Sequence, residues 1–354
     1  MRCAALLIGS PTLLDHLGVL SHHLEVPLFV TNEHAFSLAQ KFYPMFDMHF
    51  IDLQTLTIEY ISHHWDVLFV TGKFFAQEMQ LLFTAMQRSP PRIIYCPHGN
   101  SDKGRSLTTH SMQDISLFYG DHMKNLLEET GATKQLRGMI RTGNYRLPFY
   151  LRHKKFYDAL AEEALLSLPQ DKPLLLYAPT WADVENPSPF FKVIDPVIEI
   201  LSPTYNIVVL LHPLMREDHP ANLMALTSRY EEKKEVLFLE DFPAIYPLLA
   251  RCIAYLGDYS SIGYDALAMD CPIYFLLEKE GLYHRKNPIF SCGTVLNVND
   301  LVHIETWIQE DNKSAQRRAL YQHVFGDFLD AKCLQTEIWQ SLGKKCPSYL
   351  PGQT

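Results

Sequence analysis

The 354-residue sequence predicts an α/β protein made of two doubly wound halves. Short apolar runs alternate with amphipathic segments along almost the whole chain, which is typical of β-α units around parallel sheets. The alternation stops at the polar segment 169–173 and then starts again, and the chain has about the length of two domains. We therefore expect one domain over 1–155, a second over 170–325 and a helical segment over 326–354.

In the first half, apolar runs predict strands near 3–9, 26–31, 48–52, 66–71, 92–97, 115–119 and 138–143. The segments between them predict helices near 12–23, 33–42, 54–63, 74–88 and 121–130. The helix over 74–88 has apolar residues at helical spacing, and the segment Ser89-Pro90-Pro91 ends it.

In the second half, the same pattern predicts strands near 174–178, 206–211, 236–239, 253–256, 272–277 and 294–298. Helices are expected near 190–201, 219–231, 243–251 and 260–269, and the last forty residues read as helical. Because ligands of open α/β sheets bind at the carboxyl ends of strands, polar residues at those ends are the candidate site.

Composition excludes several classes of protein. The net charge of −9 argues against a general nucleic-acid binder, which is normally basic. Seven cysteines without a C-x-x-C pair favour reduced thiols and a cytoplasmic protein over a disulfide framework or a zinc ribbon. No apolar stretch approaches the about 18 residues of a membrane span. We therefore expect a soluble protein, or one bound at the inner membrane surface.

The first polar cluster follows the strand near 92–97 and reads Tyr-Cys-Pro-His-Gly-Asn-Ser-Asp-Lys-Gly. His98 at this strand end is a candidate general base, because the pKa of histidine lies near neutral pH. Lys103 is a candidate phosphate ligand as a mobile point charge. A solvated turn is the competing interpretation, since Gly, Asn, Ser and Asp are common in turns.

Two further clusters follow the strands near 174–178 and 206–211. Thr180 is a candidate hydroxyl donor to a ligand, and Trp181 can stack on a base. His212 can present a ring nitrogen to a phosphate or a leaving group. The competing interpretations are a structural tryptophan after a proline and a histidine that caps the strand end.

The fourth cluster follows the strand near 253–256 and contains Asp258, Ser260, Ser261 and Asp265. The serines fall at a predicted helix start, where unpaired backbone N–H groups favour an anion such as a diphosphate. The two aspartates can orient the serines or bind a polyol hydroxyl. Ordinary N-capping is the alternative, but the density of polar residues here exceeds what a cap needs.

A basic stretch lies between residues 131 and 157. It contains no acid and seven basic residues, namely Lys134, Arg137, Arg141, Arg146, Arg152, Lys154 and Lys155. Such a stretch can face an anionic membrane surface or a polyanionic acceptor, or it can be a solvated linker. No set of His, Asp and Glu has metal-ligand spacing, and the sequence has no P-loop, G-x-G-x-x-G or G-x-S-x-G motif.

Taken together, these motifs resemble the CDP-glycerol:poly(glycerophosphate) glycerophosphotransferase family, the enzymes of teichoic acid assembly. The matching residues stand in the family's order over about 90–280: His98-Gly99-x-x-x-Lys103, Gly143-x-x-Arg146, Tyr177-Ala178-Pro179-Thr180-Trp181, His212-Pro213 and Asp258-Tyr259-Ser260-Ser261-x-x-Tyr264-Asp265.

The resemblance implies a GT-B-like fold, in which an N-terminal acceptor-side domain and a C-terminal nucleotide-donor domain face a central cleft. It also implies the transfer of a polyol phosphate from a CDP-activated donor to an acceptor hydroxyl, with release of CMP. His98 would be the base, and His212 and the helix start at Ser260 and Ser261 would hold the diphosphate. Asp258 and Asp265 would belong to the same donor pocket, and Arg146 would also bind substrate.

Two departures from the family pattern keep alternatives open. Ala182 and Leu210 stand where the family usually carries arginine. The alternatives are a GT-B glycosyltransferase that uses a nucleotide sugar and a nucleotide-binding regulatory protein without catalysis. The acceptor, the polyol, the oligomeric state and the presence of Mg²⁺ with the diphosphate donor also stay open.

Overall fold

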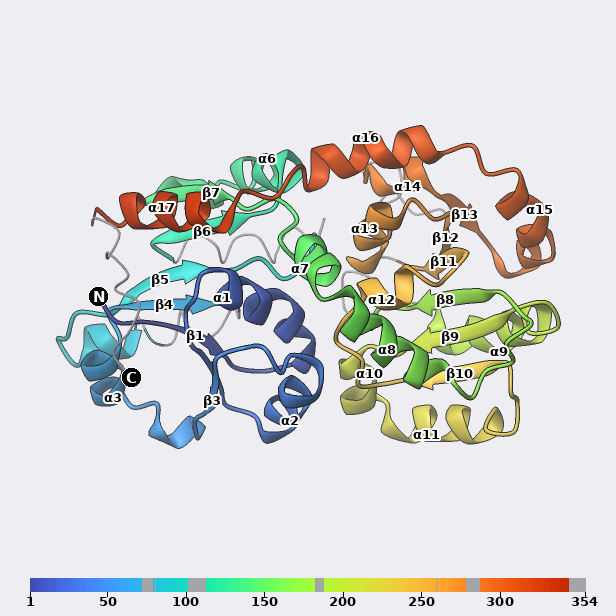
Figure 1. Cartoon of the computed structure of the whole chain (residues 1–354), viewed down its shortest axis with the longest axis horizontal. Coiled ribbons are helices and arrows are strands. Elements are labelled where there is room, and N and C mark those ends of the chain that lie inside the picture. The colour runs from blue at the N-terminus through green and yellow to red at the C-terminus, as the bar shows by residue number, and fades with distance from the viewer. Residues whose placement is uncertain are drawn as a thin grey trace. The chain divides into compact units, whose positions relative to one another are not determined.

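The computed structural model describes residues 1–71, 79, 81–100, 113–181, 188–258, 260–277 and 287–343. The chain forms two compact units (Figure 1). Unit 1 comprises Met1–Phe149 and Phe325–Thr354, and unit 2 comprises Tyr150–Val324.

Unit 1 contains a parallel sheet with the strand order β3-β2-β1-β4-β5-β6-β7. Its described strands are β1 (Cys3–Leu7), β2 (Leu28–Val30), β3 (Met48–Phe50), β4 (Val67–Val70), β5 (Arg92–Tyr95), β6 (Ile115–Phe118) and β7 (Gly138–Arg141). Its described helices are α1 (Val19–His23), α2 (Glu33–Phe42), α3 (Ile58–His64), α6 (Asp121–Glu129) and α17 (Ala331–Ser341), and α7 (Arg146–Arg152) crosses into unit 2.

Two strands of unit 1, the central strand β4 and β6, are buried over their whole length. β4 has the sequence Val-Leu-Phe-Val and β6 has Ile-Ser-Leu-Phe, and every residue of both is buried. Strands that helices cover on both faces require such continuous apolar runs. Side-chain caps begin the flanking helices: Asn32 accepts a hydrogen bond from the backbone N–H of Ala35, and Thr57 accepts one from that of Tyr60.

Unit 2 contains a second parallel sheet, with the order β10-β9-β8-β11-β12-β13. Its described strands are β8 (Leu174–Ala178), β9 (Asn206–Leu210), β10 (Val236–Leu239), β11 (Ala254–Gly257), β12 (Ile273–Leu276) and β13 (Thr294–Leu296). Its described helices are α8 (Lys154–Leu165), α9 (Phe190–Leu201), α10 (Pro213–Asp218), α11 (Pro220–Arg229), α12 (Tyr246–Leu249), α13 (Ile262–Ala266), α14 (Ile289–Cys292), α15 (Ile304–Gln309) and α16 (Ser314–Val324).

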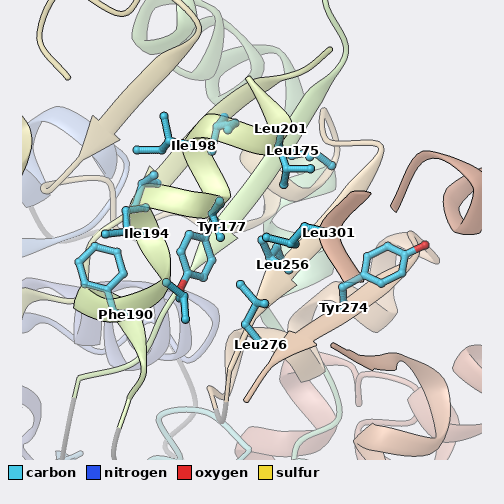
Figure 2. Packing of buried hydrophobic residues seen from close by; sticks show 14 of the residues in the cluster. Leu175, Tyr177, Phe190, Ile194, Ile198, Leu201, Leu256, Tyr274, Leu276 and Leu301 are labelled. Atoms are coloured by element: carbon cyan, nitrogen blue, oxygen red, sulfur yellow. The ribbon is translucent and has the colours of Figure 1, made fainter. Parts of the chain in front are cut away.

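The core of unit 2 lies between α9 and the sheet, as Figure 2 shows. Residues of α9 at helical spacing, Phe190, Ile194 and Ile198, face the buried side chains Leu175 and Tyr177 of β8. This spacing gives the helix one apolar face, and burial of that face fixes α9 over the centre of the sheet. The C-terminal ends of β8, β9 and β11 are neighbours because β8 pairs with both of the other strands.

The C-terminal segment packs against unit 1, although we expected a separate helical segment over 326–354. Gly143 has a φ of +67°, and a Cβ atom at this position would lie 2.1 Å from the carbonyl oxygen of Asp327. Only glycine fits this close approach. The backbone N–H of Leu329 also donates to the carbonyl of Thr142 at 3.3 Å. The chain therefore returns to its first domain, which local sequence patterns do not reveal.

The other domain boundary also differs in position. The division falls between Phe149 and Tyr150, whereas we expected the first domain to end at 155 and the second to begin at 170. α8 belongs to unit 2, where its Asp158 pairs with Arg251 at 3.0 Å. Two helices that the sequence did not predict, α7 and α8, fill this connection.

Each strand expected from the sequence has its counterpart in the two sheets. Most of the helix expected over 74–88 lies outside the described residues, while the described residues from 81 to 85 are helical. None of the helices in the described ranges is long and apolar enough to cross a bilayer.

Candidate functional site

His98 follows β5 in unit 1 and is partly exposed. Gly99 has a φ of +116°, a left-handed backbone conformation that glycine adopts without strain. Nδ1 of His98 lies 3.0 Å from the hydroxyl oxygen of Tyr95, the last residue of β5. Tyr95 is 1% exposed. The turn and this hydrogen bond together fix the orientation of the imidazole.

The groups behind His98 are protonated at neutral pH. Burial raises the pKa of the Tyr95 hydroxyl far above its usual value. Burial also raises the pKa of the Cys96 thiol, to about 12, against the opposing effects of its hydrogen bond with Tyr145 and the charge of Arg146. Tyr95 is therefore a neutral partner of His98. When the oxygen of Tyr95 accepts from Nδ1–H, the lone pair of the imidazole is on Nε2.

Arg146 lies inside unit 1, at the start of α7, and is 3% exposed. Its Nε donates to Oδ2 of Asp15 at 2.9 Å, and the hydroxyl of Tyr43 donates to Oδ1 of the same carboxylate at 2.9 Å. A buried charge needs such partners, because loss of hydration is costly. The prediction that Arg146 binds substrate stays a prediction, and this burial favours a role in positioning.

Several charges of the basic stretch have acidic partners within their own unit. Arg137 pairs with Asp114 at 3.1 Å and Arg141 with Asp121 at 3.9 Å, in addition to the buried pair of Arg146. Lys154 pairs with Asp158 in unit 2. The stretch therefore carries less unpaired positive charge than the sequence suggests.

Of two further polar residues in the first cluster, the structure describes Asn100 but not Lys103. Lys103 lies outside the described residues. Asn100 is 2% exposed, and both polar atoms of its side chain have no hydrogen-bond partner in the part of the chain that the structure describes. Buried amides normally have hydrogen-bond partners, so Asn100 is an exception among the described residues.

In unit 2, Asp258 follows β11 and is 2% exposed. Its Oδ1 accepts a hydrogen bond from the backbone N–H of Thr180 at 2.8 Å, and its Oδ2 accepts one from the hydroxyl of Ser188, also at 2.8 Å. Asp258 thus holds the segments after β8 and before α9 at the end of β11. The sequence did not predict the role of Ser188, because no local pattern pairs it with a residue so far along the chain.

Asp265 and the two serines belong to the segment after β11. Asp265 is 4% exposed, and its Oδ1 accepts a hydrogen bond from the hydroxyl of Tyr246 at 3.3 Å. Ser260 and Ser261 are partly exposed, and Oγ of Ser260 accepts from the backbone N–H of Ile262 at 3.3 Å. The serines, and not the buried carboxylate, are accessible to a ligand. Tyr259 lies outside the described residues.

His212 follows β9 and caps α10. Its Nδ1 accepts a hydrogen bond from the backbone N–H of Leu214 at 3.2 Å. A neutral imidazole that accepts at Nδ1 carries its proton on Nε2, so Nε2–H is a hydrogen-bond donor. The ring of Trp181 lies 6.3 Å from that of His212, centroid to centroid. His212 is therefore a helix cap, and its role as a donor to a ligand stays a prediction.

Strand order explains which predicted residues meet within unit 2. β8 lies between β9 and β11, so the residues that follow these three strands share one edge of the sheet. Those residues are Thr180 and Trp181 after β8, His212 after β9, and Asp258, Ser260 and Ser261 after β11. The edge combines hydroxyl groups, one N–H donor and an aromatic ring, which suits a nucleoside diphosphate.

Comparison with known proteins agrees with this chemistry. A family model described as CDP-Glycerol:Poly(glycerophosphate) glycerophosphotransferase matches residues 95–332. No curated protein matches the sequence. Among solved structures, a variant of the wall teichoic acid polymerase TagF soaked with CDPG has a TM-score of 0.64 and 12% identity, over 97% of this chain and 88% of that chain.

A second similar structure is the UDP-GlcNAc 2-epimerase from Neisseria meningitidis bound to UDP-GlcNAc. It has a TM-score of 0.58 and 13% identity, over 97% of this chain and 99% of that chain. Likeness at such low identity establishes the fold alone, which is α/β and GT-B-like, as expected. The family match establishes more, because it spans over half of the 354 residues and includes the strand-end motifs of both units. The chain belongs to the CDP-glycerol:poly(glycerophosphate) glycerophosphotransferase family.

Proposed function

We propose that this protein transfers glycerol phosphate from CDP-glycerol to an acceptor hydroxyl and releases CMP. The observation that carries the proposal is the family match over 95–332, within which the ordered strand-end motifs fall. The TagF structure soaked with CDPG supports the choice of donor. The acceptor, and binding at the inner face of a membrane, are finer parts of the same proposal.

In the proposed reaction, His98 is the general base. Its Nε2 removes the proton of the acceptor hydroxyl while Nδ1–H donates to Tyr95. The acceptor oxygen forms a bond to the phosphorus that bears glycerol, and the bond from that phosphorus to the bridging oxygen breaks. The electron pair of the broken bond stays on the phosphate of CMP, and the proton is on His98.

On the donor side, hydrogen bonds stabilise the charge that develops on the leaving phosphate. Nε2–H of His212 and the hydroxyls of Ser260 and Ser261 are the proposed donors, and Lys103 is a proposed phosphate ligand. Thr180 and Trp181 complete the proposed nucleotide site. Asp258 and Asp265 are assigned to positioning, because their carboxylates already accept hydrogen bonds from the protein.

Mg²⁺ belongs to the proposal only as a companion of the donor's diphosphate. Among the described residues there is no group of three or more His, Cys, Asp or Glu that could hold a metal ion. A cation would therefore be held mainly by phosphate oxygens, as is common for Mg²⁺. Addition of EDTA and then of Mg²⁺ to the transfer assay tests this part.

The proposal is tested by measuring CMP release from CDP-glycerol with a synthetic glycerol phosphate oligomer as acceptor. His98→Ala is expected to lose on the order of 10²–10⁴-fold in turnover, the usual contribution of a general base. Its melting temperature is expected to rise with CMP as that of the wild type does, because a ligand of the folded state stabilises it. Full turnover by His98→Ala would remove the base from the mechanism.

The same melting measurement separates the alternatives. Stabilisation by UDP or UDP-GlcNAc, but not by CMP or CDP-glycerol, would favour a nucleotide-sugar enzyme. Stabilisation by CDP-glycerol without any CMP release, across a panel of hydroxyl acceptors, would favour a regulatory protein. The test for a regulatory protein is motivated by Leu210, because the family usually carries arginine at this position. Leu210 ends β9 and is 9% exposed.

A further inference from the structure

A buried arginine of unit 2 lies at the far end of the segment that carries Ser260 and Ser261. Arg317 belongs to α16 and is 1% exposed. A guanidinium keeps its charge in proteins, and a buried charge needs partners because loss of hydration is costly. Arg317 belongs to none of the strand-end motifs, so their chemistry gives it no role.

All three guanidinium nitrogens of Arg317 donate hydrogen bonds to two aspartates. Nε donates to Oδ1 of Asp270 at 2.8 Å, and Nη2 donates to the backbone carbonyl of the same residue at 3.2 Å. Nη1 and Nη2 donate to the two carboxylate oxygens of Asp311 at 2.9 and 2.6 Å. Such a two-pronged pair fixes the plane of the guanidinium. Arg317 therefore joins the loop between α15 and α16 to Asp270 in one defined arrangement.

Asp270 ends the helical segment that follows the two serines. Residues 262–269 are helical without a break, first as α13 and then as a 3₁₀ turn over Leu267–Met269. Asp270 has a φ of +52°, a left-handed conformation that aspartate adopts more readily than most residues but still at a cost. Arg317 bonds both the side chain and the carbonyl of Asp270, so it holds this turn in place.

Two further side chains donate to the carboxylate of Asp270. They are the hydroxyl of Ser314 and Nε of Arg318, the latter at 3.2 Å. Burial raises the pKa of the Asp270 carboxyl, but the hydrogen bonds from these residues and from Arg317 outweigh it and lower the pKa below its usual value. The side chain of Arg318 is 74% exposed, and exposed ion pairs are weak. Arg317 is therefore the main cationic partner.

The segment between β11 and β12 is thus anchored at both ends. At its start, Asp258 is bonded to the segments after β8 and before α9. At its end, Asp270 is bonded to Arg317 on α16. Ser260 and Ser261 lie just after the first anchor, and a short helix moves as one body. The orientation of the serines therefore depends on both anchors.

We propose that Arg317 is a positioning residue of the donor site, which through Asp270 fixes the orientation in which Ser260 and Ser261 meet the donor's diphosphate. The inference rests on the proposed function and deepens it by adding a residue outside the motifs. The helical segment spans roughly 13 Å at 1.5 Å per residue, so Arg317 acts through this segment and does not touch the ligand.

Arg317→Met is the test variant, and two other arginines provide matched controls. Arg318→Met removes the exposed partner of the same carboxylate and is expected to behave as the wild type. Arg251→Met removes an arginine that bridges two carboxylates elsewhere in unit 2, those of Asp158 and Glu162. This variant is expected to have a lower melting temperature and an unchanged affinity for the donor.

CDP, which contains the diphosphate, is the probe in isothermal titration at a temperature at which each variant is folded. Arg317→Met is expected to bind CDP roughly 10-fold more weakly, the value of one hydrogen bond, and to raise KM for CDP-glycerol but not for the acceptor. A purely structural residue would lower only the melting temperature. Wild-type affinity for CDP in folded Arg317→Met would therefore overturn the inference.

Arg317→Lys provides a second variant in case Arg317→Met does not fold. Lysine keeps the charge beside the two aspartates but lacks the planar fork that bonds both of them. The expected result is the same weakening of CDP binding, and wild-type affinity in this folded variant would count equally against the inference.

Hydrogen exchange gives a readout that does not depend on the proposed function. Backbone amides of residues 263–269 are expected to exchange faster in Arg317→Met than in the wild type, while those of α9 stay protected. The same amides in Arg251→Met are expected to exchange as in the wild type. Unchanged exchange over 263–269 in Arg317→Met would refute the positioning role. A wild type that does not bind CDP counts against the proposed function, and the exchange then decides this inference on its own.

Discussion

Oδ1 of Asp258 accepts a hydrogen bond from the backbone N–H of Thr180 at 2.8 Å, although the two residues are 78 positions apart. This bond fixes the polar segment after β8 against the end of β11. In the proposed function these two segments bind the nucleotide donor. The geometry of the donor site therefore depends on a carboxylate that itself is buried.

Asp258→Ala is expected to weaken both folding and donor binding. The change leaves the N–H of Thr180 and the hydroxyl of Ser188 without their acceptor. The cost is about 1–3 kcal/mol for the buried N–H, and it is smaller for the partly exposed hydroxyl of Ser188. Ser188→Ala removes only one of the two bonds and is the matched control with a smaller loss. CMP titration followed by melting temperature measures both effects. Normal CMP affinity in Asp258→Ala would show that donor binding does not depend on this residue.

Arg146→Met is expected to destabilise unit 1 by about 3–5 kcal/mol, because it leaves the buried carboxylate of Asp15 without its cation. The double variant Asp15→Leu with Arg146→Met removes both charges, and it is expected to recover part of the loss. Urea unfolding midpoints measure the difference. A stable Arg146→Met variant that no longer binds substrate would instead support a direct contact.

His212→Asn is expected to fold normally and bind the donor weakly. Asparagine is a favoured N-cap, so α10 keeps its cap, but the variant lacks the Nε2–H donor. Loss of one hydrogen bond to a charged phosphate lowers CMP affinity by roughly 10- to 100-fold. Isothermal titration with CMP checks this value. His212→Ala, which also loses the cap, is expected to be less stable, and equal affinities for all three proteins would refute the donor role.

Cys96 is expected to make stability depend on pH above about 9. Burial raises the pKa of its thiol to about 12 in the folded state, from the 9.0 of an ordinary cysteine thiol. The unfolded chain loses this proton first, so the contribution is complete below pH 9 and decreases as pH rises from about 9 to about 12. The slope is about 1.4 kcal/mol per pH unit.

Urea unfolding of the wild type and of Cys96→Ala at pH 8 and pH 10 measures this contribution. The wild type is expected to lose more stability than the variant between the two pH values. Equal losses would show that the thiol does not carry the effect. In the folded protein at neutral pH, Cys333 is exposed and is expected to react with iodoacetamide, whereas Cys96, at 0% exposure, is not.

The sequence predicted the strands and the strand-end position of His98, His212 and Asp258. These features depend on neighbouring residues: a buried parallel strand requires an apolar run, and the polar residues that follow it stand at the edge where ligands bind. The resemblance of the motifs to the family predicted the type of reaction, and the family match over 95–332 agrees with that resemblance.

Only the tertiary structure determined which residues form hydrogen bonds and ion pairs with each other. Asp15 and Arg146 are 131 residues apart, and the hydroxyl of Tyr119 contacts both His16 and the carbonyl of Pro97. The return of the chain to unit 1 depends on the space beside Gly143. Local patterns carry no information on such pairs, because sheet order, and not distance along the chain, brings these residues together.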